Sequence, residues 1–70
     1  MTTEELGRIV REVRLAQRLR QDQLAAAAGV GVRFLIELEQ GKPTARLGKA
    51  LDVLGALGLQ VQIAARDGQR

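Results

Sequence analysis

The chain has 70 residues, a net charge of +3, and neither cysteine nor histidine. A chain of this length forms one small domain that buries only about 60% of its unfolded surface, so its stability as a monomer is marginal. The missing residue types exclude disulfides and the usual zinc sites, and we expect neither a metal nor a cofactor.

The start of the chain and its hydropathy predict a cytoplasmic protein. The first residues, MTTEELGR, are acidic and polar, unlike a secretory signal. No apolar run approaches the roughly 20 residues that a membrane span requires. Nine of the eleven cationic residues are arginines, whose planar fork suits phosphates and guanine edges. A GC-rich genome would also enrich arginine, so only the positions of the arginines are informative.

A first helix is predicted over residues 3–18. Thr3 suits the N-cap, and two glutamates follow in the first turn, where the helix dipole favours acidic residues. The predicted buried positions recur at helical spacing and are Leu6, Ile9, Val10, Val13 and Ala16 or Gln17. The predicted outer face carries Arg8, Arg11, Glu12 and Arg18. Leu19 is expected to turn into the core.

Two shorter helices with a glycine corner between them are predicted for residues 22–28 and 32–40. Gly29 can adopt the left-handed conformation that ends the first, and Gly31 can serve as a weak N-cap for the second. Val30 is expected to fill the corner. The predicted buried positions are Leu24, Ala25, Ala28, Leu35 and Leu38. The outward face of the second helix carries Val32, Arg33, Ile36, Glu37 and Gln40. A short helix of this kind fits the major groove of DNA.

A fourth helix is predicted after Pro43, which disfavours helix at the preceding residue. Thr44 is expected to cap it, and Gly58 to end it after Leu57. Its predicted apolar stripe is Leu47, Ala50, Leu51 and Leu54, flanked by Val53 and Leu57. Gly48 and Gly55 either lower its stability by about 1 kcal/mol each or allow close helix packing.

The last segment changes to a two-residue period, which is typical of a half-buried strand. Leu59, Val61 and Ile63 alternate there with polar residues. A single strand cannot satisfy its own backbone, and no other segment is a predicted strand, so we expect two copies of the chain to pair antiparallel as a homodimer. The alternative is a disordered or helical tail. Residues 67–70 are expected to be frayed.

These features resemble the helix-turn-helix of the phage repressor/Cro class. The resemblance is carried by Gln21, the Leu24-Ala25 pair, Gly29, Leu35, and the ending Leu38-Glu39-x-Gly41. The later run GKPTARLGKALDVLGALGLQV is similar to the HipB-like antitoxin branch. The resemblance implies an all-α repressor-like domain of four to five helices over residues 1–58, with a C-terminal β-strand over 59–66 pairing across a homodimer.

Candidate base-reading residues lie on the outward face of the predicted recognition helix. Arg33 is expected to fork onto O6 and N7 of a guanine, with a phosphate contact or a solvated side chain as the alternatives. Val32 either touches a thymine methyl or packs at the helix start. Glu37 either accepts from a cytosine N4, pairs with Arg33, or faces solvent. Phe34 is expected in the core or at its rim rather than as a wedge between bases.

Phosphate contacts are expected near helix N-termini and after the recognition helix, with an ordinary surface role as the alternative for each. The candidates are Arg20, Gln21, Gln23, Gln40, Lys42 and Arg46. Glu39 falls on the side that faces the first helix, and the resemblance implies a buried ion pair with Arg14. At Gly31, relatives often carry serine or threonine, so one cap and one phosphate hydrogen bond are expected to be missing.

The sequence therefore predicts a sequence-specific DNA-binding repressor that acts as a homodimer on double-stranded operator DNA. Catalysis is not expected, because histidine, cysteine and serine are absent and no glycine-rich phosphate loop occurs. The HipB-like resemblance further implies an antitoxin that represses its own operon and binds a HipA-like kinase toxin. The alternatives are a stand-alone regulator and a protein-interaction module that does not bind DNA.

Overall fold

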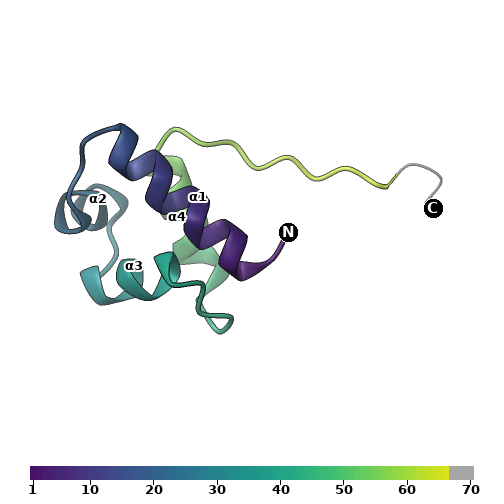
Figure 1. Cartoon of the computed structure of the whole chain (residues 1–70), viewed down its shortest axis with the longest axis horizontal. Coiled ribbons are helices and arrows are strands. Elements are labelled where there is room, and N and C mark those ends of the chain that lie inside the picture. Colours follow the sequence, from purple (N-terminus) through teal and green to yellow (C-terminus); the bar gives the residue numbers. More distant parts are fainter. Residues whose placement is uncertain (67–70) are drawn as a thin grey trace.

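The computed structural model describes residues 1–66, which form a bundle of helices followed by a long tail (Figure 1). Four helices occur in this part of the chain, at the lower end of the predicted range. They are α1 (Thr3–Ala16), α2 (Gln21–Ala28), α3 (Val32–Glu39) and α4 (Leu47–Ala56). The fraying predicted for 67–70 lies outside the described residues. None of the helices within residues 1–66 is long and apolar enough to cross a membrane.

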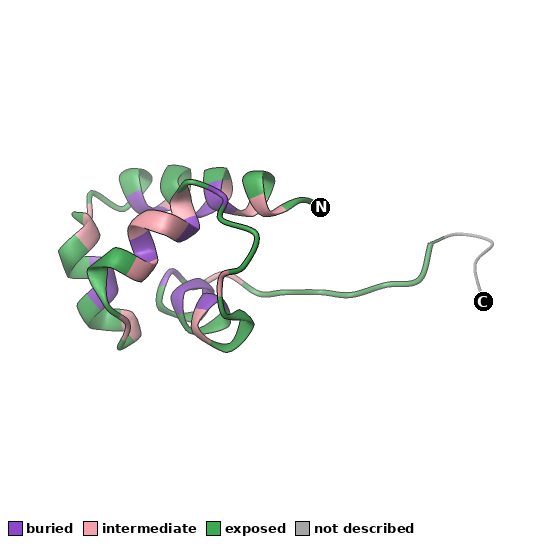
Figure 2. Ribbon diagram, turned by 90° about the horizontal axis from the view of Figure 1, so that it is seen from below, coloured by how far each residue is buried: buried purple, intermediate pink, exposed green. Residues whose placement is uncertain are grey.

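Each helix contributes one fully buried large side chain to a single core. Val10 of α1, Leu24 of α2, Leu35 of α3 and Val53 of α4 are each 0% exposed. Figure 2 shows the buried residues on the inward faces of the helices. Burying such a side chain stabilises the fold by about 1.5–3 kcal/mol, so the core fixes where α2 and α3 lie relative to α1 and α4. The predicted buried faces of α2 and α3 are confirmed.

The contact between α1 and α3 depends on Gly7, which is buried. A Cβ built at Gly7 would lie 2.7 Å from the carbonyl oxygen of Glu39 and would also overlap that of Leu38. Only glycine allows the backbones of the two helices to approach this closely. The C-terminal end of α3 is therefore fixed directly against α1.

All four helices of the described part end in the same motif: one residue has a positive φ, and the N–H of the next residue donates to the carbonyl oxygen five residues before it. The positive φ values are 58° at Arg18, 73° at Gly29, 82° at Gly41 and 77° at Gly58. The bonds run from the N–H of Leu19 to Arg14 O, of Val30 to Ala25 O, of Lys42 to Glu37 O and of Leu59 to Leu54 O. Leu19, Val30 and Leu59 also pack against the core.

The ends of α1 differ from the sequence prediction. Thr2, not Thr3, is the N-cap: its hydroxyl accepts from the N–H of Glu5 at 3.0 Å, and the Glu5 carboxylate accepts from the N–H of Thr2 at 2.7 Å. This capping box satisfies two backbone donors at once. The bond from the Thr2 backbone also lowers the pKa of Glu5. The helix ends at Ala16 rather than at residue 18, because Arg18 takes the left-handed conformation.

The fourth helix begins later than predicted. Arg46, not Thr44, precedes its first turn, and no side-chain cap is formed there. The later start agrees with a turn at residues 43 and 44 and with a bond from the N–H of Ala45 to Lys42 O at 3.3 Å.

The buried face of α4 is also rotated from the predicted stripe. Leu47 is 71% exposed and Leu51 is 45% exposed, whereas Ala50, Val53, Leu54 and Leu57 are buried. A Cβ built at Gly48 or Gly55 would meet no atom within 4 Å, so neither glycine serves close packing inside the described chain.

The predicted strand over residues 59–66 is absent from the described single chain. Leu59 packs against the core, but Val61 is 54% exposed and Ile63 is 94% exposed. The tail runs away from the helices without joining a sheet (Figures 1 and 2). The physical reason is that a strand needs a neighbouring strand, and residues 1–58 supply none.

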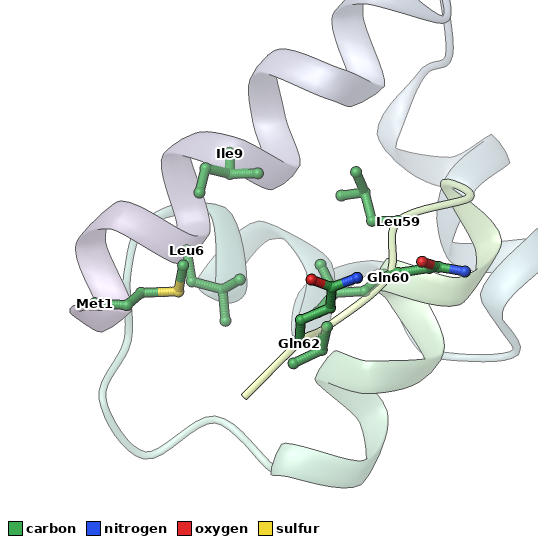
Figure 3. A pocket seen from close by; sticks show the side chains of 8 residues that line it. Met1, Leu6, Ile9, Leu59, Gln60 and Gln62 are labelled. Carbon is green, nitrogen blue, oxygen red and sulfur yellow. The ribbon is translucent and has the colours of Figure 1, made fainter. Parts of the chain in front are cut away.

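An open apolar groove of about 260 Å³ separates α1 from the start of the tail. Figure 3 shows Met1 and, from α1, Leu6 and Ile9 on one side, and Leu59 and Gln62 on the other. Helix α3 contributes no lining residue to this groove. The apolar surface near the tail is therefore distinct from the surface on which α3 faces outward.

Candidate nucleic-acid interface

The corner between α2 and α3 is built as the glycine pattern predicts. Gly29 adopts a left-handed conformation, and the N–H of Val30 donates to Ala25 O at 3.0 Å. Gly31 then takes extended dihedrals as the N-cap of α3, without a side-chain cap bond. Val30 packs against the core and fills the corner. The two helices are thus joined by a short, well-bonded connection that fixes their mutual angle.

The face of α3 away from the core carries the predicted base-reading residues. Leu35 and Leu38 are 0% and 3% exposed, whereas Val32 is 43% exposed and Arg33 is also exposed. Arg33 therefore stands outward, where its guanidinium is free to meet a ligand.

Glu37 is half-buried and pairs with Lys42, whose Nζ lies 3.1 Å from Oε1. Of the alternatives for Glu37, pairing with Arg33 is wrong for the described residues, because Lys42 takes that place. The pair is partly exposed, so its contribution to stability is small, about 0–1 kcal/mol. Both groups can therefore change partners at low cost.

Arg14 and Glu39 form a nearly buried bidentate pair, with exposed side-chain fractions of 8% and 4%. Nε of Arg14 donates to Oε2 of Glu39 at 2.6 Å, and Nη2 donates to Oε1 at 3.0 Å. Arg14 Nη1 donates to Leu19 O at 2.8 Å, and Gln21 Nε2 donates to Glu39 Oε1 at 3.1 Å. The network joins the end of α1, the start of α2 and the end of α3.

This network leaves no buried side-chain nitrogen or oxygen without a partner among residues 1–66. Full satisfaction matters because a buried charge without its partner costs about 3–5 kcal/mol. Gln21, predicted as a phosphate contact, uses its side-chain amide inside the network. Its backbone N–H lies in the first turn of α2, where helix geometry leaves such groups free for an anion.

The other predicted phosphate contacts at the start of α2 are exposed. Arg20 Nε lies 3.0 Å from Oδ1 of Asp22, and this bond lowers the pKa of the Asp22 carboxyl. Gln23 is exposed, and its side-chain oxygen accepts from the N–H of Arg20 at 2.8 Å. Because Arg20 and Asp22 are 71% and 65% exposed, their pair is weak and can open to a phosphate.

Residues after α3 complete the candidate set. Gln40 is the C-cap of α3, Lys42 follows Gly41, and Arg46 precedes α4; all three are exposed. All three follow the last residue of α3 along the chain. Exposed donors therefore occur at the start of α2 and beyond the end of α3.

Comparison with known proteins identifies the family. Residues 10–63 match the model of the helix-turn-helix family, and this match covers more than half of the chain. The chain belongs to the helix-turn-helix family. One relative is 55% identical over 64 residues, which cover 91% of this chain and 84% of that protein. It is an uncharacterized HTH-type transcriptional regulator, y4mF, of Sinorhizobium fredii (strain NBRC 101917 / NGR234).

Sequence reasoning missed three features of this helix-turn-helix domain. Gln17 donates from Nε2 to Leu57 O at 2.8 Å and ties α1 to the end of α4. Lys49 Nζ lies 5.8 Å from the centre of the Phe34 ring, which packs at the core rim as expected rather than standing free. The third is the left-handed Arg18. A glycine marks the end of each of the other three helices, but no glycine near residue 18 marks the end of α1.

Proposed function

We propose that the chain is a sequence-specific DNA-binding transcriptional repressor. The observation that carries the proposal is the outward face of α3: Arg33 is exposed while Leu35 and Leu38 fix the opposite face in the core. An eight-residue helix presented in this way fits the major groove. The relative's name, HTH-type transcriptional regulator, supports a regulatory role.

Direct reading of bases is assigned to three residues of α3. Arg33 donates two hydrogen bonds to a guanine, and Val32 contacts a thymine methyl. Glu37 accepts from a cytosine N4 after Lys42 leaves it for a phosphate. The exchange is inexpensive because the Glu37–Lys42 pair is partly exposed, at 32% and 47%.

Contacts to the DNA backbone are assigned to groups at the two ends of the α2–α3 unit. At the start of α2 they are Arg20, Gln23 and the backbone N–H of Gln21; beyond α3 they are Gln40, Lys42 and Arg46. Such contacts position α3 but carry little sequence information. They also make binding depend steeply on salt.

The repressor acts as a homodimer whose tails pair as antiparallel strands. The tail supports this part of the proposal, because its described residues 60–66 are exposed and make no backbone hydrogen bond within the described chain. Pairing would satisfy those groups and cover Val61 and Ile63. A two-fold dimer would present two α3 helices to major grooves about 34 Å apart on a palindromic operator.

The similarity to the HipB-like branch supports a narrower role. In that role the dimer is an antitoxin that represses its own operon and binds a HipA-like kinase toxin. Co-expression with the product of the neighbouring gene tests it: a stable complex containing that product, together with kinase activity in it, is the expected result. A neighbouring gene that encodes no such protein would leave a stand-alone regulator.

The decisive experiment is a fluorescence titration with the duplex upstream of the chain's own gene and with a random duplex of equal length. Both are titrated at several salt concentrations. We expect the affinity for the upstream duplex to exceed the affinity for the random duplex by about 10³-fold or more. Both affinities should fall steeply as the salt concentration rises. Equal and weak binding to both duplexes would instead favour a protein-interaction module.

A further inference from the structure

Arg18 departs from the pattern by which this chain ends its other helices. At the ends of α2, α3 and α4 the residue with positive φ is a glycine, whereas at the end of α1 it is Arg18, with φ 58°. Within residues 1–66, Arg18 is the one residue other than glycine with a positive φ. Glycine adopts this conformation freely, but a side chain there crowds a neighbouring carbonyl oxygen. Arg18 is therefore strained.

The side chain of Arg18 makes no polar contact within residues 1–66 that would offset this strain. It is exposed, and no hydrogen bond or ion pair joins it to any other of the described residues. The motif itself needs only the backbone, since the N–H of Arg18 donates to Leu15 O and that of Leu19 donates to Arg14 O. A glycine at position 18 would keep both bonds without strain.

A second departure from the pattern is also basic. The residue after the positive φ is apolar and packs against the core at the ends of α1, α2 and α4, but is Lys42 at the end of α3. Arg18 lies three residues before the first residue of α2, and Lys42 three residues after the last residue of α3. The two exceptions thus place cations on either side of the α2–α3 unit.

We infer that Arg18 contacts a DNA phosphate beside the groove that α3 enters, and that this contact is why an arginine occupies a position better suited to glycine. Strained residues persist where function requires them. Arg18 is two residues from Arg20, so its guanidinium extends the backbone-contacting set at the start of α2 towards the end of α1. The inference rests on the proposed DNA-binding function.

The test compares Arg18→Gly with Arg18→Lys and with Arg11→Gln, which removes an exposed charge from the outer face of α1. Each protein is titrated against its upstream duplex at several salt concentrations and is unfolded by heat. Arg18→Gly should melt about 4–8 °C higher, because the strain is released. Its slope of log affinity against log salt should be shallower by about 0.9 per protomer.

Arg18→Lys should keep the wild-type slope, and Arg11→Gln should change it by less than half as much as Arg18→Gly. A glycine variant that is more stable but has the wild-type slope would overturn the phosphate contact. A glycine variant no more stable than wild type would overturn the strain argument. In both cases wild type still separates its upstream duplex from the random one, so the proposed function survives; if wild type fails that comparison, the proposed function itself fails.

Discussion

Arg14 and Glu39 are 25 residues apart in the chain and meet as a bidentate pair with an N–O distance of 2.6 Å. The pair joins the end of α1 to the end of α3, and Gln21 extends it to the start of α2. Three segments that flank the candidate DNA surface therefore share one buried network. Its geometry sets the orientation of α3 more strictly than the corner at Gly29 could alone.

Glu39→Gln should lower the free energy of unfolding by about 3–5 kcal/mol, because Arg14 would stay buried without its countercharge. Urea unfolding followed by circular dichroism measures the change. The matched control is Glu12→Gln on the exposed face of α1, where a change within about 0.5 kcal/mol is expected. A loss below about 1 kcal/mol in Glu39→Gln would contradict the role given to the pair.

Gly7→Ala should destabilise the domain by about 1–3 kcal/mol, because the new methyl group would collide with backbone atoms that cannot rotate away. Gly48→Ala is the control: its Cβ would meet no atom within 4 Å, and it should stabilise α4 by about 0.5–1 kcal/mol. Thermal unfolding of both variants checks the prediction. Equal melting temperatures for the two variants would show that the backbones of α1 and α3 can move apart enough to accept the new methyl group.

Arg33→Ala should weaken binding to the upstream duplex by about 1–3 kcal/mol and relax specificity at one base pair per half-site. The reason is the loss of the proposed two-bond contact from Arg33 to one guanine. A binding series with single base-pair substitutions measures it, with Arg8→Ala on the outer face of α1 as the control. Unchanged discrimination at every position would remove Arg33 from the base-reading set.

Ile63→Asp should convert the proposed dimer to a monomer in sedimentation experiments, because a charge would replace an apolar side chain at the proposed strand pair. Val61→Asp should have the same effect. Gln62→Asp adds the same charge to the opposite side of the strand and should leave the dimer largely intact. A dimer that persists in both Ile63→Asp and Val61→Asp would place the interface elsewhere.

The capping box predicts a pH-dependent contribution from Glu5. Its pKa in the folded chain lies below the ordinary value of 4.5, chiefly because the Thr2 N–H donates to the carboxylate. The charge on Glu5 therefore adds stability above pH 4.5, and this is lost as pH falls through the lowered folded pKa. The stability difference between wild type and Glu5→Gln should shrink over that acid range in urea titrations. A difference that is constant with pH would argue against it.

Local sequence patterns determined most of the helical framework. The buried residues Leu24, Leu35 and Leu38 and the glycine corner follow from helical spacing and backbone freedom, which depend on near neighbours in the chain. The family resemblance added the pairing of Arg14 with Glu39. The outward position of Arg33 follows from the same periodicity.

Tertiary structure decided the features that depend on contacts between distant segments. Leu47 and Leu51 are exposed because α4 packs against the core through Ala50, Val53 and Leu54. Gln21 binds Glu39, and Lys42 rather than Arg33 pairs with Glu37, because side chains select partners only after the helices are assembled. The tail shows the same dependence: an alternating pattern specifies which side chains would share a face, but a strand forms only where another strand supplies its backbone partners.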